Sequence, residues 1–406
     1  MSFDPAAVRR DFPLLDPARH GGRIHYLDNA ATAQVPLPVL DAVRRHETAS
    51  RANVHRSVHR LAEAATRAFE GARVTMARYL NAARREEIVF TSGTTAAINL
   101  VAHSYGARMK PGDEVLVSLM EHHSNIVPWQ MLRDRQGIVL KAIPVTQDGR
   151  LDLDRLDELV TERTRLIAVT HASNVTGAVT DVARVVAAAR AVGAEVLLDG
   201  AQMAPHGPLD VQALGVGFYA CSGHKMFGPN AIGVLWGRFD LLKSMPPFLG
   251  GGEMISHVTL EKTEYARPPM RFEAGTPPIA PAIGMAAAAD WLSGQDLAGA
   301  EAHMVGLAGR LIDGLGGLDR VRVVGPSGLQ QRLPVVAFTV DGVHPHDVSQ
   351  LLDSRGVMVR GGHHCAEPLA EALGVCGTTR AALALYNDQA DVDALLDGVR
   401  QVTKIL

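Results

Sequence analysis

The chain has 406 residues, of which 47% are hydrophobic, and carries 40 basic and 43 acidic side chains. This length and composition exclude a disordered chain and provide material for one large domain with a smaller second one. The formal net charge of -3 gives no reason to expect nucleic acid as a partner. Three cysteines, Cys221, Cys365 and Cys376, are too few for a disulfide framework and favour a reducing, cytoplasmic setting.

The sequence predicts neither an export signal nor a membrane-spanning segment. The first residues lack the basic start and the apolar stretch of a signal peptide. The most apolar long stretch, residues 279–292, has 14 residues and contains Asp290. It is too short to cross a bilayer, so we expect no contact with a membrane.

Short β-branched runs alternate with amphipathic or Ala-rich segments between about residues 85 and 240. This alternation is typical of a mostly parallel sheet that helices cover on both faces. The predicted strands are 86–92, 113–119, 137–145, 165–173, 194–201 and 215–222.

Polar or small residues follow five of these strands. In parallel sheets, ligands bind at the carboxyl ends of the strands, so we expect the five ends to converge on one site. They are Thr91-Ser92-Gly93, Glu121-His122-His123, His171-Ala172-Ser173-Asn174, Asp199-Gly200-Ala201-Gln202 and Ser222-Gly223-His224-Lys225.

The remainder of the chain predicts loops followed by a second unit. Residues 245–280 are rich in Pro and Gly and are expected to be irregular, with a candidate subunit contact. The elements expected after them are helices 282–291, 301–315, 346–356 and 391–402, with strands 321–325, 334–340 and 357–361. We therefore predict a large domain over 23–292 and a small α+β domain formed by 1–22 and 293–406.

Thr94 and Thr95 lie between a predicted strand and a predicted helix over 96–106. Backbone N–H groups and hydroxyls at such a junction can bind an anion. Considered alone, the segment is better interpreted as a capped helix start.

Asp199 and Lys225 are the strongest candidates for catalytic residues. Asp199 ends an apolar run, where a carboxylate needs a cationic partner such as a protonated pyridine nitrogen. Lys225 follows 26 residues later, between a strand and a Gly-Pro turn, where a lysine can lose its proton and act as a Schiff-base nucleophile. A solvated surface cation is the ordinary alternative for Lys225.

The ordered set TSGTT, EHH, SNVTG, DGAQ and SGHK resembles the fold-type I enzymes of pyridoxal 5′-phosphate (PLP). Within them, it is most similar to the class V aminotransferase group that contains the cysteine desulfurases. The resemblance extends from Tyr26 to Asn387. It implies an α/β fold with a mostly parallel seven-stranded sheet in the large domain, and PLP as the cofactor.

The resemblance also implies a role for each matching residue. Lys225 would hold PLP as a Schiff base, Asp199 would bind the ring nitrogen, and His122 would stack on the ring and shuttle a proton. Gln202 would bond the ring hydroxyl, and Asn174 would orient the ring or the substrate. The phosphate would be held by Thr94, Thr95, Ser222 and His224, together with Thr276 of the partner subunit, which makes a homodimer part of the site.

Cys365 lies in the segment Arg360-Gly361-Gly362-His363-His364-Cys365-Ala366. Two glycines and two histidines are poor core material, so we expect a mobile loop whose positive surroundings favour the thiolate. The alternative is a small buried residue. The segment RGGHHCAEP resembles the loop of SUF-type (group II) cysteine desulfurases and selenocysteine lyases, in which the cysteine removes sulfur as a persulfide.

Four basic residues are predicted to contact the substrate. The resemblance implies that Arg380 binds the substrate carboxylate through a fork-shaped pair of hydrogen bonds. Without the resemblance, a surface arginine on a helix would be the ordinary interpretation. Arg360 is expected beside it, and His55 and Arg56 resemble a segment that reaches the neighbouring active site.

No resident metal is expected. His122 and His123 are adjacent at a predicted strand end, so their side chains would point in opposite directions. His346 lies 19 residues before Cys365, at the position of a histidine that exchanges with a zinc ligand of the acceptor in some SUF-type enzymes. It is therefore a candidate transient zinc ligand, or alternatively only a helix-start residue. Cys221 is expected in the core, and Cys376 has no predicted role.

Together these features predict conversion of L-cysteine to L-alanine with a persulfide on Cys365. The expected sulfur acceptor is a protein of SUF type, zinc scaffold-like or SufE-like, in iron–sulfur cluster assembly. Selenocysteine lyase, another cysteine C–S lyase, an aminotransferase and a non-catalytic scaffold are the alternatives. Ala96 and the residues after Gly177 differ from the usual pattern, which leaves a specialised acceptor open.

Overall fold

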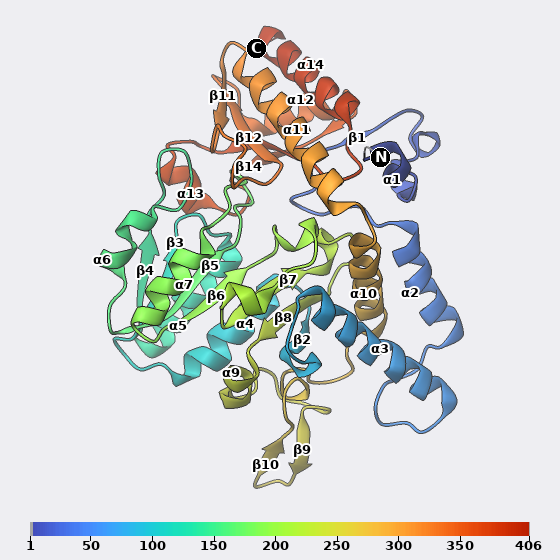
Figure 1. The fold of residues 1–406 in the computed structure, drawn as a ribbon, viewed down its shortest axis with the longest axis vertical. Helices are drawn as coiled ribbons and strands as arrows, with labels where there is room; N and C mark the ends of the chain where they lie inside the picture. The colour runs from blue at the N-terminus through green and yellow to red at the C-terminus, as the bar shows by residue number, and fades with distance from the viewer. Residues whose placement is uncertain (1–2, 406) are drawn as a thin grey trace.

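Seven strands form the central sheet of the large domain in the computed structural model, which describes residues 3–405 (Figure 1). Their order is β2-β8-β7-β6-β5-β3-β4, and β8 alone runs antiparallel to its neighbours. The prediction of a mostly parallel seven-stranded sheet is confirmed. The strands are β2 (Ile88–Thr91), β3 (Glu114–Ser118), β4 (Val139–Ile143), β5 (Thr164–Thr170), β6 (Glu195–Asp199), β7 (Phe218–Ser222) and β8 (Gly233–Gly237).

Two hydrophobic cores lie on opposite faces of this sheet, because successive side chains of a strand point to opposite faces. In β5, Ile167 and Val169 enter one core while Leu166 and Ala168 enter the other. Helices α3, α7 and α10 contribute to the first core, and α4, α5 and α9 to the second. The sheet is therefore covered on both faces, as predicted.

Several helices of this region begin with a side chain that caps the first turn. Asp181, for example, accepts a hydrogen bond from Arg184 N at the start of α7. The helices of this region are α1 (Pro5–Arg9), α2 (Leu37–Ala49), α3 (Arg60–Tyr79), α4 (Thr94–Leu100), α5 (Val127–Gln136), α6 (Leu156–Leu159), α7 (Val182–Ala191), α8 (Val211–Leu214), α9 (Phe239–Ser244) and α10 (Ile279–Ser293). The predicted helix over 96–106 begins at Thr94 and continues beyond α4 as a π-helical turn, Val101–Tyr105.

A four-stranded antiparallel sheet forms the small domain, in the order β11-β12-β15-β14. Its core is a separate cluster to which helices α11, α12 and α14 contribute. The elements are α11 (Leu297–Gly316), β11 (Val321–Val324), β12 (Val335–Val340), α12 (Pro345–Asp353), β14 (Arg360–Gly362), α13 (Glu367–Ala372), β15 (Thr378–Ala382) and α14 (Gln389–Ile405).

The single strand predicted over 357–361 is wrong, because the structure divides it between two sheets. β13 (Val357–Met358) pairs in parallel with β1 (His25–Tyr26), whereas β14 joins the four-stranded sheet. The N-terminal part of the chain is thus joined to the small domain through β1. The domain boundaries at residues 23 and 292 stay a prediction.

A hairpin projects from the large domain, at the opposite end of the molecule from α14 (Figure 1). It consists of β9 (Ile255–Val258) and β10 (Thr263–Tyr265), so the prediction of an entirely irregular segment over 245–280 is wrong. Neither strand has a buried face, and Leu260 at the tip is fully exposed. A strand without a buried side produces no hydrophobic alternation, which explains why the sequence pattern missed it.

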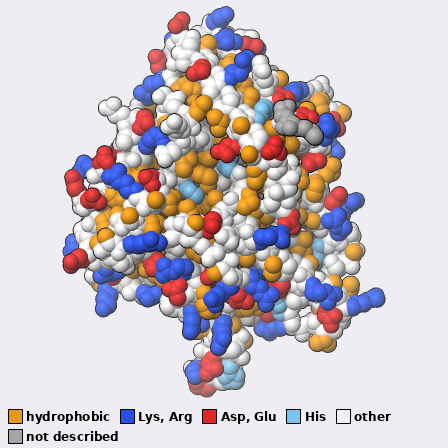
Figure 2. All heavy atoms as spheres, viewed as in Figure 1, with side chains coloured by type: hydrophobic (Ala, Val, Ile, Leu, Met, Phe, Trp, Pro, Cys, Tyr) orange, Lys and Arg blue, Asp and Glu red, His pale blue; other side chains and the backbone are white. Residues whose placement is uncertain are grey.

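Both signs of charge are interspersed over the face of the molecule in Figure 2, as the balanced composition predicts. None of the helices within residues 3–405 is long and apolar enough to cross a membrane. All three cysteines are free; Cys221 is buried in β7, as expected, and Cys376 is exposed.

Candidate active site

Four of the five predicted strand ends converge on one cavity of about 170 Å³ between the two domains. The fifth, Thr91-Ser92-Gly93, does not line it: Thr91 and Ser92 line a different cavity, and only Thr94 and Thr95, which follow them, reach this one. The predicted residues that line the cavity are Thr94, Thr95, His122, Asn174, Asp199, Gln202, Ser222, His224, Lys225, Arg360, Cys365 and Arg380. The residues that the sequence did not single out are Ala30, Ala31, Ser124, Thr170, Ala201 and His364.

Lys225 ends a short 3-10 turn directly after β7. Burial lowers the pKa of Lys225 to about 8, an effect that the Asp199 carboxylate partly opposes and Arg380 and Arg360 reinforce. The amine is therefore much more readily available in its neutral form than an ordinary lysine. This is the property that Schiff-base and proton-transfer chemistry require.

Asp199 ends β6 and is buried. Burial raises the pKa of its carboxyl group, while a hydrogen bond from Ala201 N, 2.9 Å from Oδ1, and the charge of Lys225 lower it. A buried carboxylate with one backbone donor can take a further cationic partner. A protonated pyridine nitrogen satisfies this requirement.

A polar corner forms where α4 begins beside the end of β7. Ser222 Oγ accepts from Thr94 N at 2.8 Å and lies 2.7 Å from Thr94 Oγ1. Thr95 and His224 line the same cavity. Hydroxyl and amide donors gathered in this way are suited to a phosphate group.

His122 lies in the turn after β3, which ends at Ser118, so its predicted place at a strand end is wrong. Its Nδ1 accepts from Ser124 N at 3.1 Å. Burial, and to a smaller extent the charge of Lys225, lower the pKa of His122 to about 4. The ring is thus neutral near pH 7, and its proton lies on Nε2.

His123 faces away from the cavity. Its Nε2 accepts from Glu367 N at 3.1 Å, and its ring is tilted by 52° from that of His122. The two rings therefore do not form a chelate. Within the described part of the chain, no three His, Cys, Asp or Glu side chains are grouped to hold a metal ion.

Arg380 lies in β15 with only 2% of its surface exposed, which rejects the alternative of a surface arginine on a helix. Its Nη1 donates to Asn174 O at 2.9 Å, and its Nη2 donates to Asp28 Oδ1 at 3.0 Å. Its Nε has no partner among residues 3–405. One edge of the guanidinium therefore remains available for a carboxylate.

Asp28 is a residue of this region that sequence reasoning missed. It pairs with Arg380 across the two domains. Its only signal in the sequence was its place in the segment that begins at Tyr26, within the resemblance.

Arg360 lies in strand β14, next to β15, and pairs in register with Arg380 of β15. It brings a second cation to the same wall of the cavity. Gln202 donates to Ala30 O at 2.9 Å, which ties the N-terminal segment to the floor of the site.

Cys365 is exposed and lies in a short turn between β14 and α13. The turn is anchored: Cys365 O accepts from His123 N at 2.7 Å, and His364 O accepts from Asn174 Nδ2 at 2.8 Å. His364 and Cys365 both have left-handed backbone conformations, with φ values of 54° and 56°. These bonds anchor a turn that presents the thiol at the cavity, and the mobility of the segment stays a prediction.

Three predicted residues, His55, Arg56 and Thr276, lie outside the cavity of this single chain. His55 Nε2 is 3.7 Å from Glu70 Oε1, and Arg56 Nε is 2.5 Å from Glu253 Oε1. Thr276 lines a different cavity, beside β2.

His346 is also outside the cavity but lies beside the turn of Cys365. It is exposed on α12, and its Nε2 would be 3.3 Å from a Cβ placed on Gly362.

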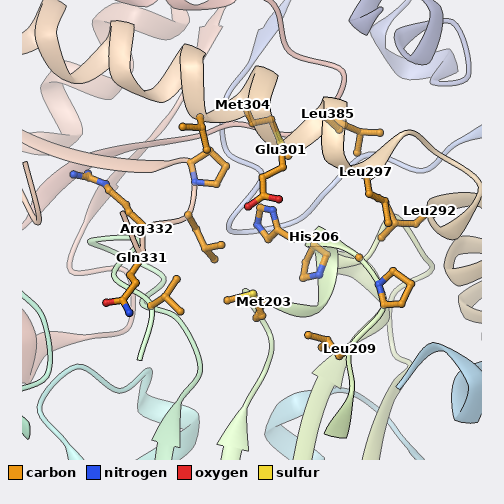
Figure 3. A pocket seen from close by; sticks show the side chains of 18 of the residues that line it. Met203, His206, Leu209, Leu292, Leu297, Glu301, Met304, Gln331, Arg332 and Leu385 are labelled. Carbon is orange, nitrogen blue, oxygen red and sulfur yellow. The ribbon is translucent and has the colours of Figure 1, made fainter. Parts of the chain in front are cut away.

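A larger cavity of about 390 Å³ lies elsewhere at the junction of the domains. Figure 3 shows Met203, His206, Leu297, Glu301 and Met304 among its lining residues. Neither Lys225 nor Cys365 lines it. Size alone therefore does not locate the chemistry of this protein.

Comparison with known proteins identifies the family. The profile of the family described as "Aminotransferase class-V" matches residues 25–395. The chain belongs to the class V aminotransferase family. A probable cysteine desulfurase of Streptomyces coelicolor is 46% identical to it, over 98% of this chain and 97% of the relative. A cysteine desulfurase of Dickeya dadantii is 47% identical over the same shares of both chains.

Among solved structures, the cysteine desulfurase CsdA of Escherichia coli has a TM-score of 0.92 to this chain, with 42% identity and complete coverage of both chains. The fold of this class V aminotransferase family member is that of the fold-type I PLP-dependent enzymes, as predicted.

Proposed function

We propose that this chain is a PLP-dependent cysteine desulfurase that converts L-cysteine to L-alanine and carries the sulfur as a persulfide on Cys365. The observation that carries this proposal is the exposed Cys365 thiol at the cavity that also contains Lys225, Asp199 and Arg380. An aminotransferase needs no thiol at this position.

The residues of the cavity fit PLP. Asp199 would bind the pyridine nitrogen, Lys225 the aldehyde carbon, Gln202 the ring hydroxyl and His122 a face of the ring, while Asn174 orients ring or substrate. The polar corner of Thr94, Thr95, Ser222 and His224 would hold the phosphate. When bound, PLP supplies an electron sink for negative charge at the substrate Cα.

The side chains of the cavity can then divide the work of the reaction. Arg380, with Arg360 beside it, binds the substrate carboxylate and so orients the Cα–H bond. The neutral amine of Lys225 takes the Cα proton. His122 can provide a proton from Nε2.

Cys365 carries out the sulfur transfer. Its thiolate attacks the substrate sulfur, an S–S bond forms, the Cβ–S bond breaks, and the carbon keeps the electron pair that is later protonated to give alanine. Lys225, Arg360 and Arg380 line the same cavity as this thiol.

A homodimer is part of the proposal. Thr276, His55 and Arg56 do not reach the cavity of their own chain, so we assign their roles to the neighbouring site: Thr276 to the phosphate, and the other two to the substrate.

We further propose a SUF-type (group II) enzyme, in the cytoplasm, that supplies iron–sulfur cluster assembly. The persulfide would pass to a zinc scaffold-like or SufE-like acceptor protein. The exposed imidazole of His346 beside Gly362, three residues before Cys365, supports a transient zinc contact with such an acceptor.

Incubation of the purified protein with L-cysteine or L-selenocysteine, a reductant and PLP tests this function. We expect alanine and sulfide from L-cysteine, and loss of both products and of the absorbance of the Lys225 Schiff base in Lys225→Ala. Alanine released only from L-selenocysteine would instead identify a selenocysteine lyase.

A further inference from the structure

Glu121 is fully buried beneath the turn that carries His122. Its Oε1 accepts from Thr170 N at 2.9 Å, and its Oε2 accepts from Asn125 Nδ2 at 2.7 Å. Ser118 Oγ donates to the same carboxyl group. One side chain thus binds the end of β3, the turn after it and the end of β5.

One of these bonds leads to the cofactor site and another to the hydrophobic core. Thr170 pairs in register with Asp199 in the next strand, and the following amide, His171 N, donates to Asp199 O at 2.8 Å. On the other side, Asn125 Oδ1 accepts from the indole of Trp129, which is completely buried. Glu121 therefore lies between the residue predicted to stack on the PLP ring and the residue predicted to bind its nitrogen.

Stability alone does not account for a carboxyl group at this position. Burial raises the pKa of Glu121 to about 8, and the charge of Asp199 raises it as well, whereas the three hydrogen bonds lower it. Burying an ionisable group is costly, and an apolar residue of similar size is often as good for stability. An apolar residue, however, could not accept hydrogen bonds from three donors on separate elements.

We propose that Glu121 is a positioning residue of the cofactor site: its carboxyl group fixes the turn that bears His122 against the strand pair that bears Asp199. The proposal rests on the proposed PLP site. Glu121 itself does not line the cavity, so it acts through His122 and Asp199.

Glu121→Gln is the variant that tests this role, because a carboxamide has nearly the same shape but only one accepting oxygen. Either Thr170 N or Asn125 Nδ2 then faces an NH₂ group, and one connection of the turn is lost. The matched control is Glu114→Gln. Glu114 is also buried, at the start of β3, but its partners Lys141 and Arg163 do not line the cofactor cavity, whereas Thr170, a partner of Glu121, does.

Three measurements on the PLP-loaded proteins separate positioning from stability: the visible circular dichroism of bound PLP, the melting temperature, and kcat and KM for L-cysteine. We expect Glu121→Gln to weaken or shift the dichroism band and to lower kcat roughly tenfold. KM should stay within about twofold, because Arg380 and Arg360 are untouched. Glu114→Gln should lower the melting temperature but leave the band and kcat unchanged.

A wild-type band and kcat in Glu121→Gln would overturn the proposal, as would equal changes in both variants. If Glu121→Gln does not fold, Ser118→Ala is the second variant, because it removes only one of the donors to Glu121. A weakened or shifted dichroism band of PLP in Ser118→Ala supports the proposal, and a wild-type band refutes it. The band is measured without substrate. A wild-type protein that binds PLP but forms no alanine from L-cysteine would refute the proposed function and still leave the role of Glu121 measurable.

Discussion

Replacement of Arg380 by lysine should separate charge from geometry in substrate binding. The guanidinium already donates to Asn174 O and Asp28 Oδ1, and its Nε has no partner among the described residues. A substrate carboxylate can therefore bind the Nε and Nη2 edge with two hydrogen bonds. Lysine keeps the positive charge but offers a point donor, so one of these bonds is lost.

The size of the effect follows from that single bond. A hydrogen bond to a charged group contributes roughly 1.5–3 kcal/mol, which corresponds to a loss of about 10- to 150-fold in kcat/KM for L-cysteine. The buried position of Arg380 and its pairing with Asp28 also predict a lower melting temperature.

Binding measured from the absorbance of PLP provides the control. Cysteamine lacks the carboxylate, so Arg380→Lys should weaken the binding of L-cysteine and leave that of cysteamine unchanged. Equal weakening for both compounds would refute the assignment of Arg380 to the carboxylate and indicate a general disturbance of the site.

Three further predictions concern the proton, the acceptor and the dimer. Because burial lowers the pKa of Lys225 to about 8, kcat should fall as the pH is lowered below that value, where the amine becomes protonated; a profile that is flat between about pH 6 and 9 would contradict this role. His346→Ala should reduce stimulation by a zinc-bearing acceptor protein while basal alanine formation is unchanged, and equal loss of both would count against a zinc contact. Lys225→Ala and Thr276→Val subunits, mixed and reassembled, should recover tight PLP binding at one of the two sites if Thr276 acts across the dimer; no recovery would place Thr276 in its own site or in none.

The sequence was most informative where buried strands end in polar residues. β5, β6 and β7 are apolar runs followed by Asn174, Asp199 and Lys225, so both the sheet and the convergence of its strand ends could be predicted. The hairpin β9–β10 could not, because a strand exposed on both sides leaves no alternation to detect.

Contacts between distant segments were also beyond the sequence. Asp28 meets Arg380 across 352 positions, and the carboxyl group of Glu121 meets the amide of Thr170 across 49. The anchoring of the Cys365 turn depends on His123 and Asn174, which belong to the other domain. Such contacts are set by the packing of strands within a domain or of the two domains against each other, and they have no local pattern.

The most direct test of the account is mass spectrometry of the protein after one turnover with L-cysteine in the absence of reductant. We predict that the peptide containing Cys365 gains the mass of one sulfur atom, that Cys376→Ser changes neither this gain nor the alanine formed, and that Cys365→Ala abolishes the persulfide and desulfuration together. Undiminished release of alanine and sulfide by Cys365→Ala, or sulfur found on Cys376 in place of Cys365, would contradict the proposed mechanism.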